Sequence, residues 1–133
     1  MAQTIRRPIL GFDHIALLVR DIAESGDFYR DVLGLQEVPN DMGRATVRWF
    51  SLGDGRHLHL SQGDMAGVGI KRSNHFALAA RNFDETIEHF RASGLAFQDF
   101  AGEAGKVHMR PDGFRMVFIQ DPNGYWIEIN DHA

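Results

Sequence analysis

The sequence predicts an α+β fold in which two repeated βαβββ modules form a curled mixed sheet with a central cleft and helices on the outside. Three observations lead to this prediction. A strand-and-helix pattern recurs at an offset of 61 residues (75 minus 14), a hairpin pattern recurs at an offset of 69 residues (128 minus 59), and a glycine-rich stretch separates the copies. We expect one domain over residues 1–133, made of a module at 10–62, a linker at 63–73 and a module at 74–131.

The first repeated segment is predicted to be a short strand followed by a helix. Residues 13–21 align with residues 74–82, so that His, Ala, Leu and Arg coincide and acidic residues meet amides. In each copy an apolar run precedes apolar residues at helical spacing. Gly34 and Gly94 then follow the two helices, as a left-handed cap requires.

The second repeated segment is predicted to be a β-hairpin. Apolar runs flank Asp54-Gly55 in the first copy and Asn123-Gly124 in the second, and both dipeptides are typical of tight hairpin turns. We expect the hairpin strands at residues 47–50, 57–61, 116–119 and 126–130, and one further short strand per module at residues 36–38 and 97–100.

Composition excludes several classes of site and partner. The 133 residues are 44% hydrophobic and carry a formal charge of −4 without long runs of one sign, so nucleic acid and membrane are not expected partners. The chain contains no cysteine, which rules out thiolate ligands and cysteine nucleophiles. With no leader or membrane-span pattern, we expect a cytoplasmic protein.

The repeat places four metal-binding residue types at two pairs of equivalent positions. His14 and His75 fall on the two first strands, and His59 and Glu128 fall on the two last strands. Strand alternation directs these side chains away from the helices, so the four can converge on one metal. Three imidazoles and one carboxylate suit Zn, Ni, Co, Fe or Mn rather than Ca or Mg, and an octahedral ion would keep positions open for substrate.

The motifs DHIAL at residues 13–17, FYRDVLGL at 28–35 and DPNGYWIEI at 121–129 resemble the vicinal-oxygen-chelate superfamily of glyoxalases, bleomycin-resistance proteins and extradiol dioxygenases. The resemblance covers nearly the whole chain and is glyoxalase-like. It implies paired modules around a cleft, usually in a homodimer, with metal ligands on the first and last strand of each module. His59 departs from glyoxalase I, which commonly has an acidic residue there.

The leading functional hypothesis is a metal-dependent lyase or isomerase that acts on a small oxygen-chelating substrate through an enediolate-type anion. Glu128 would be both a ligand and the catalytic proton acceptor. Two alternatives stay open: a metal-dependent dioxygenase or thiol transferase, and a bleomycin-resistance-like protein that binds a drug or metabolite without turnover.

Two features of the site stay undecided at this point. His57 lies two residues from His59 on the same strand face and competes with it as the ligand of the first module. The site can also form within one chain or be shared across a dimer. The residues predicted to bind substrate are Arg48, Trp49, His57, His108, Arg110 and Phe118, and alternation alone does not decide whether Arg48 or Trp49 faces the cleft.

Overall fold

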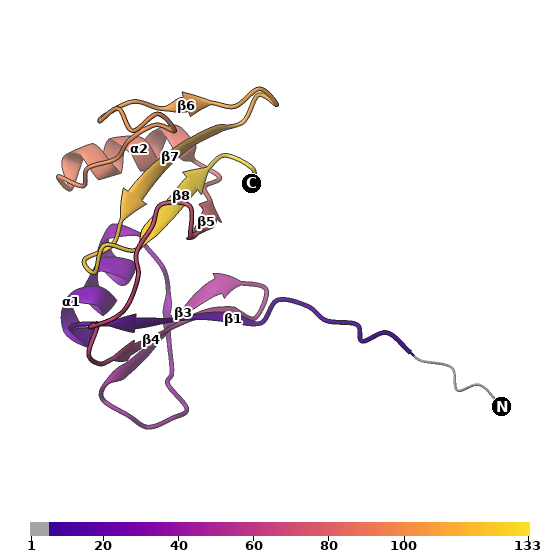
Figure 1. The fold of residues 1–133 in the computed structure, drawn as a ribbon, viewed down its shortest axis with the longest axis vertical. Helices are drawn as coiled ribbons and strands as arrows, with labels where there is room; N and C mark the ends of the chain where they lie inside the picture. The colour runs from indigo at the N-terminus through magenta and orange to yellow at the C-terminus, as the bar shows by residue number, and fades with distance from the viewer. Residues whose placement is uncertain (1–5) are drawn as a thin grey trace.

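The computed structural model describes residues 6–133 and contains two four-stranded mixed sheets (Figure 1). The first sheet has the strand order β1-β4-β3-β2 and the second has the order β5-β8-β7-β6. The repeated α+β architecture predicted from the sequence is therefore confirmed. No helix within residues 6–133 is long and apolar enough to cross a membrane.

The first module is built by residues 14–62. Asp21 begins its helix by accepting hydrogen bonds from the backbone N–H groups of Ala23 and Glu24, as an N-cap does. Its elements are β1 (His14–Val19), α1 (Ile22–Asp27), a π-helical segment η1 (Phe28–Val32), β2 (Glu37–Val38), β3 (Val47–Gly53) and β4 (Arg56–Gln62).

The second module follows the same order with a longer helix. Its elements are β5 (His75–Ala79), α2 (Phe83–Ala92), β6 (His108–Met109), β7 (Arg115–Gln120) and β8 (Trp126–Asn130). The fourth strand of this sheet is β6, not the predicted strand at residues 97–100. In that predicted segment only Gln98 makes isolated bridges, to Ala104 and Phe118, because the chain turns back there.

The strand registers of the two sheets correspond. β1 runs parallel to β4 with Ala16 opposite His59, and β5 runs parallel to β8 with Ala77 opposite Glu128. His14 and His75 each lie two residues before that alanine. The repeat alignment thus describes a real equivalence between the two sheets.

One hydrophobic core joins the modules on the helix side of both sheets. Leu58 and Leu60 of β4 and Ile127 and Ile129 of β8 are buried there, as alternation predicts. Other members of this core are Val19, Tyr29, Phe50, Phe83, Ile87, Phe90, Phe97, Val117 and Ile119. The opposite face of each sheet is free of helices.

A buried polar network fixes one module to the other. The Tyr29 hydroxyl donates to Asp121 Oδ2 at 2.7 Å, and Asn123 Nδ2 donates to Ser25 Oγ at 2.9 Å. Asn123 Oδ1 also accepts from the backbone N–H of Arg20 at 2.8 Å. The turn between β7 and β8 therefore connects modules as well as strands.

The two predicted hairpin turns differ. Asp54 and Gly55 both have positive φ, which is the two-residue turn expected from their sequence. In the second hairpin only Gly124 has positive φ. Asn123 instead uses its side chain to bind the other module, so tertiary contacts determine this turn.

Candidate metal and substrate site

The helix-free face of the first sheet carries a stack of three rings. The imidazole of His59 lies 4.3 Å from that of His14 and 4.1 Å from the Trp49 ring, with interplanar angles of 20° and 11°. His59 Nε2 is buried and has no hydrogen-bond partner. A buried nitrogen without a partner costs free energy, and a bound metal ion would remove that cost.

His14 is oriented by its neighbour in sequence. Its Nδ1 lies 2.6 Å from Asp13 Oδ2. Because an ionised carboxylate only accepts hydrogen bonds, Nδ1 carries the proton and Nε2 keeps a free lone pair. The same contact lowers the pKa of the Asp13 carboxyl, which holds it in the ionised state.

Burial lowers the pKa of His59, and the neighbouring His14 and His57 lower it further. The lowered pKa favours the neutral form of the imidazole. A neutral imidazole is the form that binds metal ions.

The corresponding face of the second sheet carries the other pair of predicted ligands. His75 Nε2 lies 3.6 Å from Glu128 Oε1. His75 Nδ1 lies 2.8 Å from the carbonyl oxygen of Arg72, which requires the proton on Nδ1 and leaves the lone pair on Nε2. Asn130 Nδ2 donates to Glu128 Oε2 at 2.7 Å, so the other carboxylate oxygen faces His75.

A pocket of about 220 Å³ opens over this second pair. It brings together His75 and Glu128 with three residues predicted to contact substrate, His108, Arg110 and Phe118. Its full lining is His75, Phe100, His108, Arg110, Met116, Phe118 and Glu128. The wall is largely aromatic, and its one guanidinium, that of Arg110, is paired with Asp112 at 2.7 Å and lies 3.0 Å from His132 Nε2.

The structure separates Arg48 from the candidate site. Register places Trp49 opposite His59 and Arg48 opposite Leu60, so Arg48 points to the helix side. There it forms two hydrogen bonds to Glu37, at 2.7 and 2.9 Å, and one to Asp27 at 3.1 Å. Arg48, predicted to bind substrate, therefore lies away from the predicted ligands, whereas Trp49 lies beside one of them.

His57 lies on the same face as His59, with ring centroids 5.8 Å apart and 6.1 Å from Trp49. In the register it is opposite His14, the position that Trp126 holds opposite His75 in the second sheet. His59 corresponds in the same way to Glu128. The repeat therefore favours His59 as the ligand and His57 as a wall residue.

The four predicted ligands form two separate pairs within one chain. Among residues 6–133, no three His, Asp or Glu side chains lie close enough together to hold a metal ion. His14 and His59 occupy one sheet, and His75 and Glu128 occupy the other. Each sheet thus carries half of the predicted ligand set.

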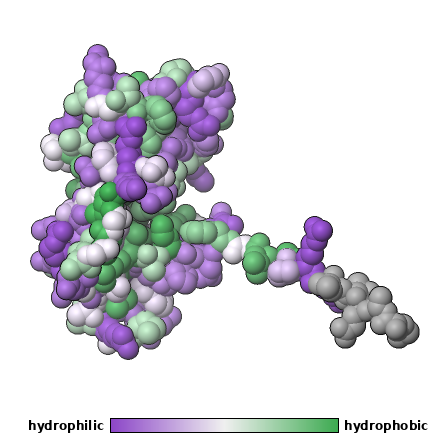
Figure 2. Space-filling model, viewed as in Figure 1, coloured by the Kyte–Doolittle hydropathy of each residue, from purple (hydrophilic) through white to green (hydrophobic). Residues whose placement is uncertain are grey.

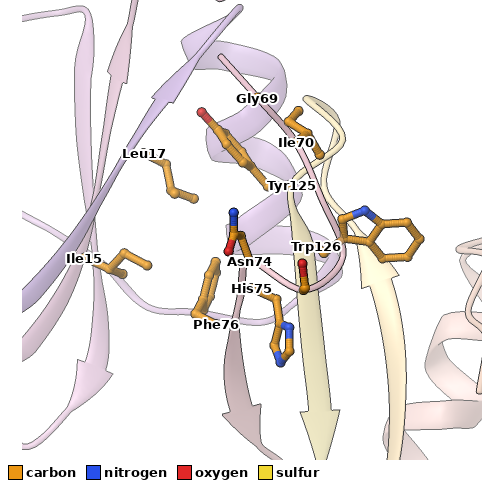
Figure 3. A pocket seen from close by; sticks show the side chains of 10 residues that line it. Ile15, Leu17, Gly69, Ile70, Asn74, His75, Phe76, Tyr125 and Trp126 are labelled. Carbon is orange, nitrogen blue, oxygen red and sulfur yellow. The ribbon is translucent and has the colours of Figure 1, made fainter. Parts of the chain in front are cut away.

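The two modules also enclose a pocket of about 460 Å³ between the edge strands β1 and β5 (Figure 3). Ile15 and Leu17 project toward Phe76 across it. Only one of the predicted ligands, His75, is in its lining. This largely apolar pocket lies on the core side of the strands and does not gather the ligand pairs.

Two residues for which no role was predicted orient the second pair of predicted ligands. Asn130 is buried, lies two residues after Glu128 and donates a hydrogen bond to it. Arg72 sits in the linker, where no periodic pattern marks it. Its guanidinium carbon lies 4.8 Å from the Phe118 ring centroid and its side chain donates to the carbonyl of Phe100 at 2.6 Å.

Comparison with known proteins identifies relatives along nearly the whole chain. The family model described as the Glyoxalase/Bleomycin resistance protein/Dioxygenase superfamily matches residues 11–129. The uncharacterized protein YwbC of Bacillus subtilis is 28% identical over 121 residues, covering 87% of this chain and 93% of YwbC. A lactoylglutathione lyase of Pseudomonas putida is 28% identical over 152 residues, covering 89% of this chain and 83% of that enzyme.

Solved structures share the fold at lower identity. The oxidase ChaP-H2 superposes with a TM-score of 0.74 at 23% identity, covering 93% of this chain and 94% of the oxidase. The fosfomycin resistance protein FosX of Listeria monocytogenes superposes with a TM-score of 0.72 at 21% identity, covering 95% and 96% of the two chains. These similarities establish the common fold.

Proposed function

Because the chain belongs to the Glyoxalase/Bleomycin resistance protein/Dioxygenase superfamily, we propose that it is a metal-dependent lyase or isomerase of the glyoxalase type. Its substrate would be a small molecule that presents two neighbouring oxygen atoms. The metal would be a divalent ion of Zn, Ni, Co, Fe or Mn held by His14, His59, His75 and Glu128. The similarity to the lactoylglutathione lyase of P. putida supports this class of reaction.

The observation that carries the proposal is the unpartnered nitrogen of His59. The Nε2 atom of His59 is buried beside the ring of His14. In His14 and His75 it is Nδ1 that has a hydrogen-bond partner, which leaves Nε2 of each ring free to bind a metal. Three imidazoles and one carboxylate are a donor set suited to these ions. The residues present therefore fit such a metal.

The site is completed by a second copy of the chain in this proposal. His14 and His59 of one copy join the partner's His75 and the partner's Glu128, which yields two equivalent sites in a homodimer. The separation of the two ligand pairs within one chain supports this arrangement.

When bound, the metal ion would polarise the substrate oxygens and stabilise negative charge on them. Glu128 would accept the proton from the adjacent carbon, since Asn130 holds one of its oxygens and leaves the other directed to the pocket. Arg110 and the rings of Phe100 and Phe118 would position the remainder of the substrate. His57 and Trp49 would form the opposite wall.

Metal content tests the ligand set directly. Plasma mass spectrometry on gently purified protein should find about one transition metal per chain in the wild type, because two half-sets of ligands make one site and a dimer therefore has two sites. We expect the metal to be lost in His59→Ala and in Glu128→Ala and retained in His57→Ala. A metal-free wild type after soaking with each candidate ion would rule out the proposal and leave a binder without metal.

A mixed dimer tests whether the site is shared. If His14→Ala chains are combined with Glu128→Ala chains, the shared arrangement leaves one site with all four ligands intact. The expected result is one metal ion per mixed dimer and none in either parent dimer. Absence of metal from the mixed dimer, together with a metal-loaded wild type, would assign the site to a single chain.

Turnover tests the reaction class. We expect metal-dependent conversion of at least one member of a panel of 2-oxoaldehyde hemithioacetals and 2-substituted acyl thioesters. Glu128→Gln should reduce turnover by roughly 10² to 10⁴. A metal-loaded wild type that converts none of them would count against lyase and isomerase chemistry and direct attention to ring cleavage or thiol transfer.

A further inference from the structure

We propose that residues 9–12 of one copy, here called the N-terminal arm, close the mouth of the candidate site of a second copy by packing against its Phe100. This inference rests on the shared site proposed above and adds a specific contact between the copies. In this proposal, the exposed surface at Phe100 of each copy is covered by the N-terminal arm of the other copy.

The arm is apolar, and its side chains are exposed with respect to the rest of residues 6–133. Ile9, Leu10 and Phe12 are 100%, 86% and 60% exposed. Figure 1 shows this segment running straight out from the start of β1, away from both modules, and Figure 2 shows its hydrophobic surface outside the body of the molecule. Three large apolar side chains so close in sequence are rarely left in water without a partner.

The arm is joined directly to a predicted metal ligand. Phe12 precedes His14 by two residues, and an extended chain spans roughly 3.5 Å per residue. When His14 meets the partner's His75 and the partner's Glu128 at a shared metal, Phe12 lies within roughly 7 Å of His14. The arm is then delivered to the pocket that surrounds the partner's ligand pair.

An apolar receiving surface exists at that pocket. Phe100 belongs to the lining of the pocket that contains His75 and Glu128, yet 59% of it is exposed. Its position is fixed by Arg72, whose guanidinium carbon lies 5.4 Å from the ring centroid and whose side chain donates to the Phe100 carbonyl. A rigidly held, exposed ring beside a pocket suits an apolar segment better than water.

Closure by the arm would exclude water from the reacting groups. The pocket is open in the single chain, and a carboxylate that accepts a proton works best in a site from which water is removed. Leu10 and Phe12 lie on the same side of an extended segment, so both can face Phe100 while Ile9 faces outward.

Cross-linking between copies tests the contact, and the absence of natural cysteine makes it clean. Chains carrying Leu10→Cys are mixed with differently tagged chains carrying Phe100→Cys and treated with a short bis-maleimide. Met42→Cys, which is 56% exposed and lies in the first module, replaces Phe100→Cys in the matched control. We expect the yield of covalent dimer with Phe100→Cys to be at least ten times the yield with Met42→Cys. Equal yields, or no product with Phe100→Cys, would overturn the proposal.

A second measurement leaves the receiving surface unchanged. With p-benzoylphenylalanine at position 12, illumination should attach the arm to a peptide of the second copy that contains Phe100. Attachment only within the same chain, or to the first module of the second copy, would also overturn the proposal. The metal content of the same samples distinguishes this proposal from the proposed function. A dimer that contains metal but shows no cross-link to Phe100 would reject only the contact of the arm. A dimer that shows the cross-link but contains no metal would reject only the metal site.

The energetic consequence is measured with Leu10→Ser and Phe12→Ser combined. We expect the dissociation constant of the dimer to rise at least tenfold, equivalent to about 1.4 kcal/mol, because each serine removes an apolar side chain from the contact. An unchanged dissociation constant would contradict the packing of the arm. Ile9→Ser serves as the control on the outward-facing side.

Discussion

His14 and His75 each have one ring nitrogen bound to a fixed acceptor. Asp13 supplies the acceptor in the first module, at 2.6 Å, and the carbonyl of Arg72 supplies it in the second, at 2.8 Å. Such partners fix the tautomer and orientation of the imidazole. The Asp13 carboxylate can be removed by substitution, whereas the backbone carbonyl of Arg72 cannot. Substitution of Asp13 therefore tests whether such a partner orients the imidazole for metal binding.

We expect Asp13→Asn to weaken metal binding by about tenfold, the lower end for the loss of such a partner, because Asp13 is exposed to solvent. The measurement is chelator competition, with circular dichroism to verify the fold. Asp41→Asn, an exposed aspartate in the loop before β3, is the matched control. An affinity equal to that of the control would mean that Asp13 does not orient His14.

The ion pair between Glu37 and Arg48 gives the stability of the first module a pH dependence. Hydrogen bonds from Arg48 hold the pKa of Glu37 below its ordinary value of about 4.5. A depressed carboxyl pKa stabilises the fold above that ordinary value, and the stabilisation is lost as the pH falls through the lower, folded pKa.

We therefore expect Glu37→Gln to lower the free energy of unfolding at pH 7 by up to about 1 kcal/mol, because the pair is partly exposed. The difference from wild type should shrink below pH 4.5 and vanish in stronger acid. Urea unfolding across this range measures it, with Glu103→Gln as an exposed control. A difference that is constant with pH would disprove the linkage.

At the scale of elements, α1 is held against β3 by a close approach at Gly26. A Cβ atom on Gly26 would overlap the guanidinium of Arg48, which Glu37 and Asp27 keep in place. Gly26 has an ordinary helical φ, so its role is to provide space. This glycine explains how an arginine fits between a helix and the sheet beneath it.

Gly26→Ala should destabilise the protein by about 1–2 kcal/mol, since overpacking exceeds the gain in helix propensity. In an Arg48→Met background the same change should be neutral or stabilising, because the obstructing group is gone. Thermal unfolding of the four proteins completes the cycle. Gly69→Ala, which meets no atom within 4 Å, is the control, and equal effects of Gly26→Ala in both backgrounds would refute the explanation.

At the scale of the molecule, the buried contact between Tyr29 and Asp121 holds the two modules in one arrangement. Both residues are buried, and the hydroxyl donates to the carboxylate at 2.7 Å. Burial and the neighbouring Asp121 raise the pKa of Tyr29 well above its ordinary value, so it stays a donor. This arrangement also keeps the two pairs of predicted ligands apart within the chain.

Tyr29→Phe should reduce the free energy of unfolding by about 1.5–3 kcal/mol, since the buried carboxylate of Asp121 loses one of its donors. Tyr125→Phe, which loses a hydrogen bond to the neutral carbonyl of Leu18, should cost about 1 kcal/mol. Denaturant unfolding compares the two. A smaller loss for Tyr29→Phe than for Tyr125→Phe would contradict the greater contribution of the hydrogen bond between Tyr29 and Asp121.

The sequence by itself determined the repeat, the faces of the strands and the pairing of the candidate ligands. Strand alternation is a local property with a period of two residues, so Leu58 and Leu60 could be placed in the core and His59 opposite them without the structure. Asn130 lies two residues after Glu128, so the same alternation gives it the same strand face, but alternation does not predict its hydrogen bond to that carboxylate. The repeat made two weak histidine signals into one strong pattern.

Tertiary structure decided everything that depends on pairing between distant segments. The register of β3 against β4 turned Trp49 toward His59 and Arg48 toward the helix, a choice that residues 47–53 do not encode. The fourth strand of the second sheet is β6, which pairs with β7, and not the predicted strand at residues 97–100. Packing of the modules engages the Asn123 side chain in a hydrogen bond to Ser25, in place of the predicted two-residue turn. It also kept the two ligand pairs apart, because one chain buries its apolar strand faces against its own helices and leaves both ligand faces open.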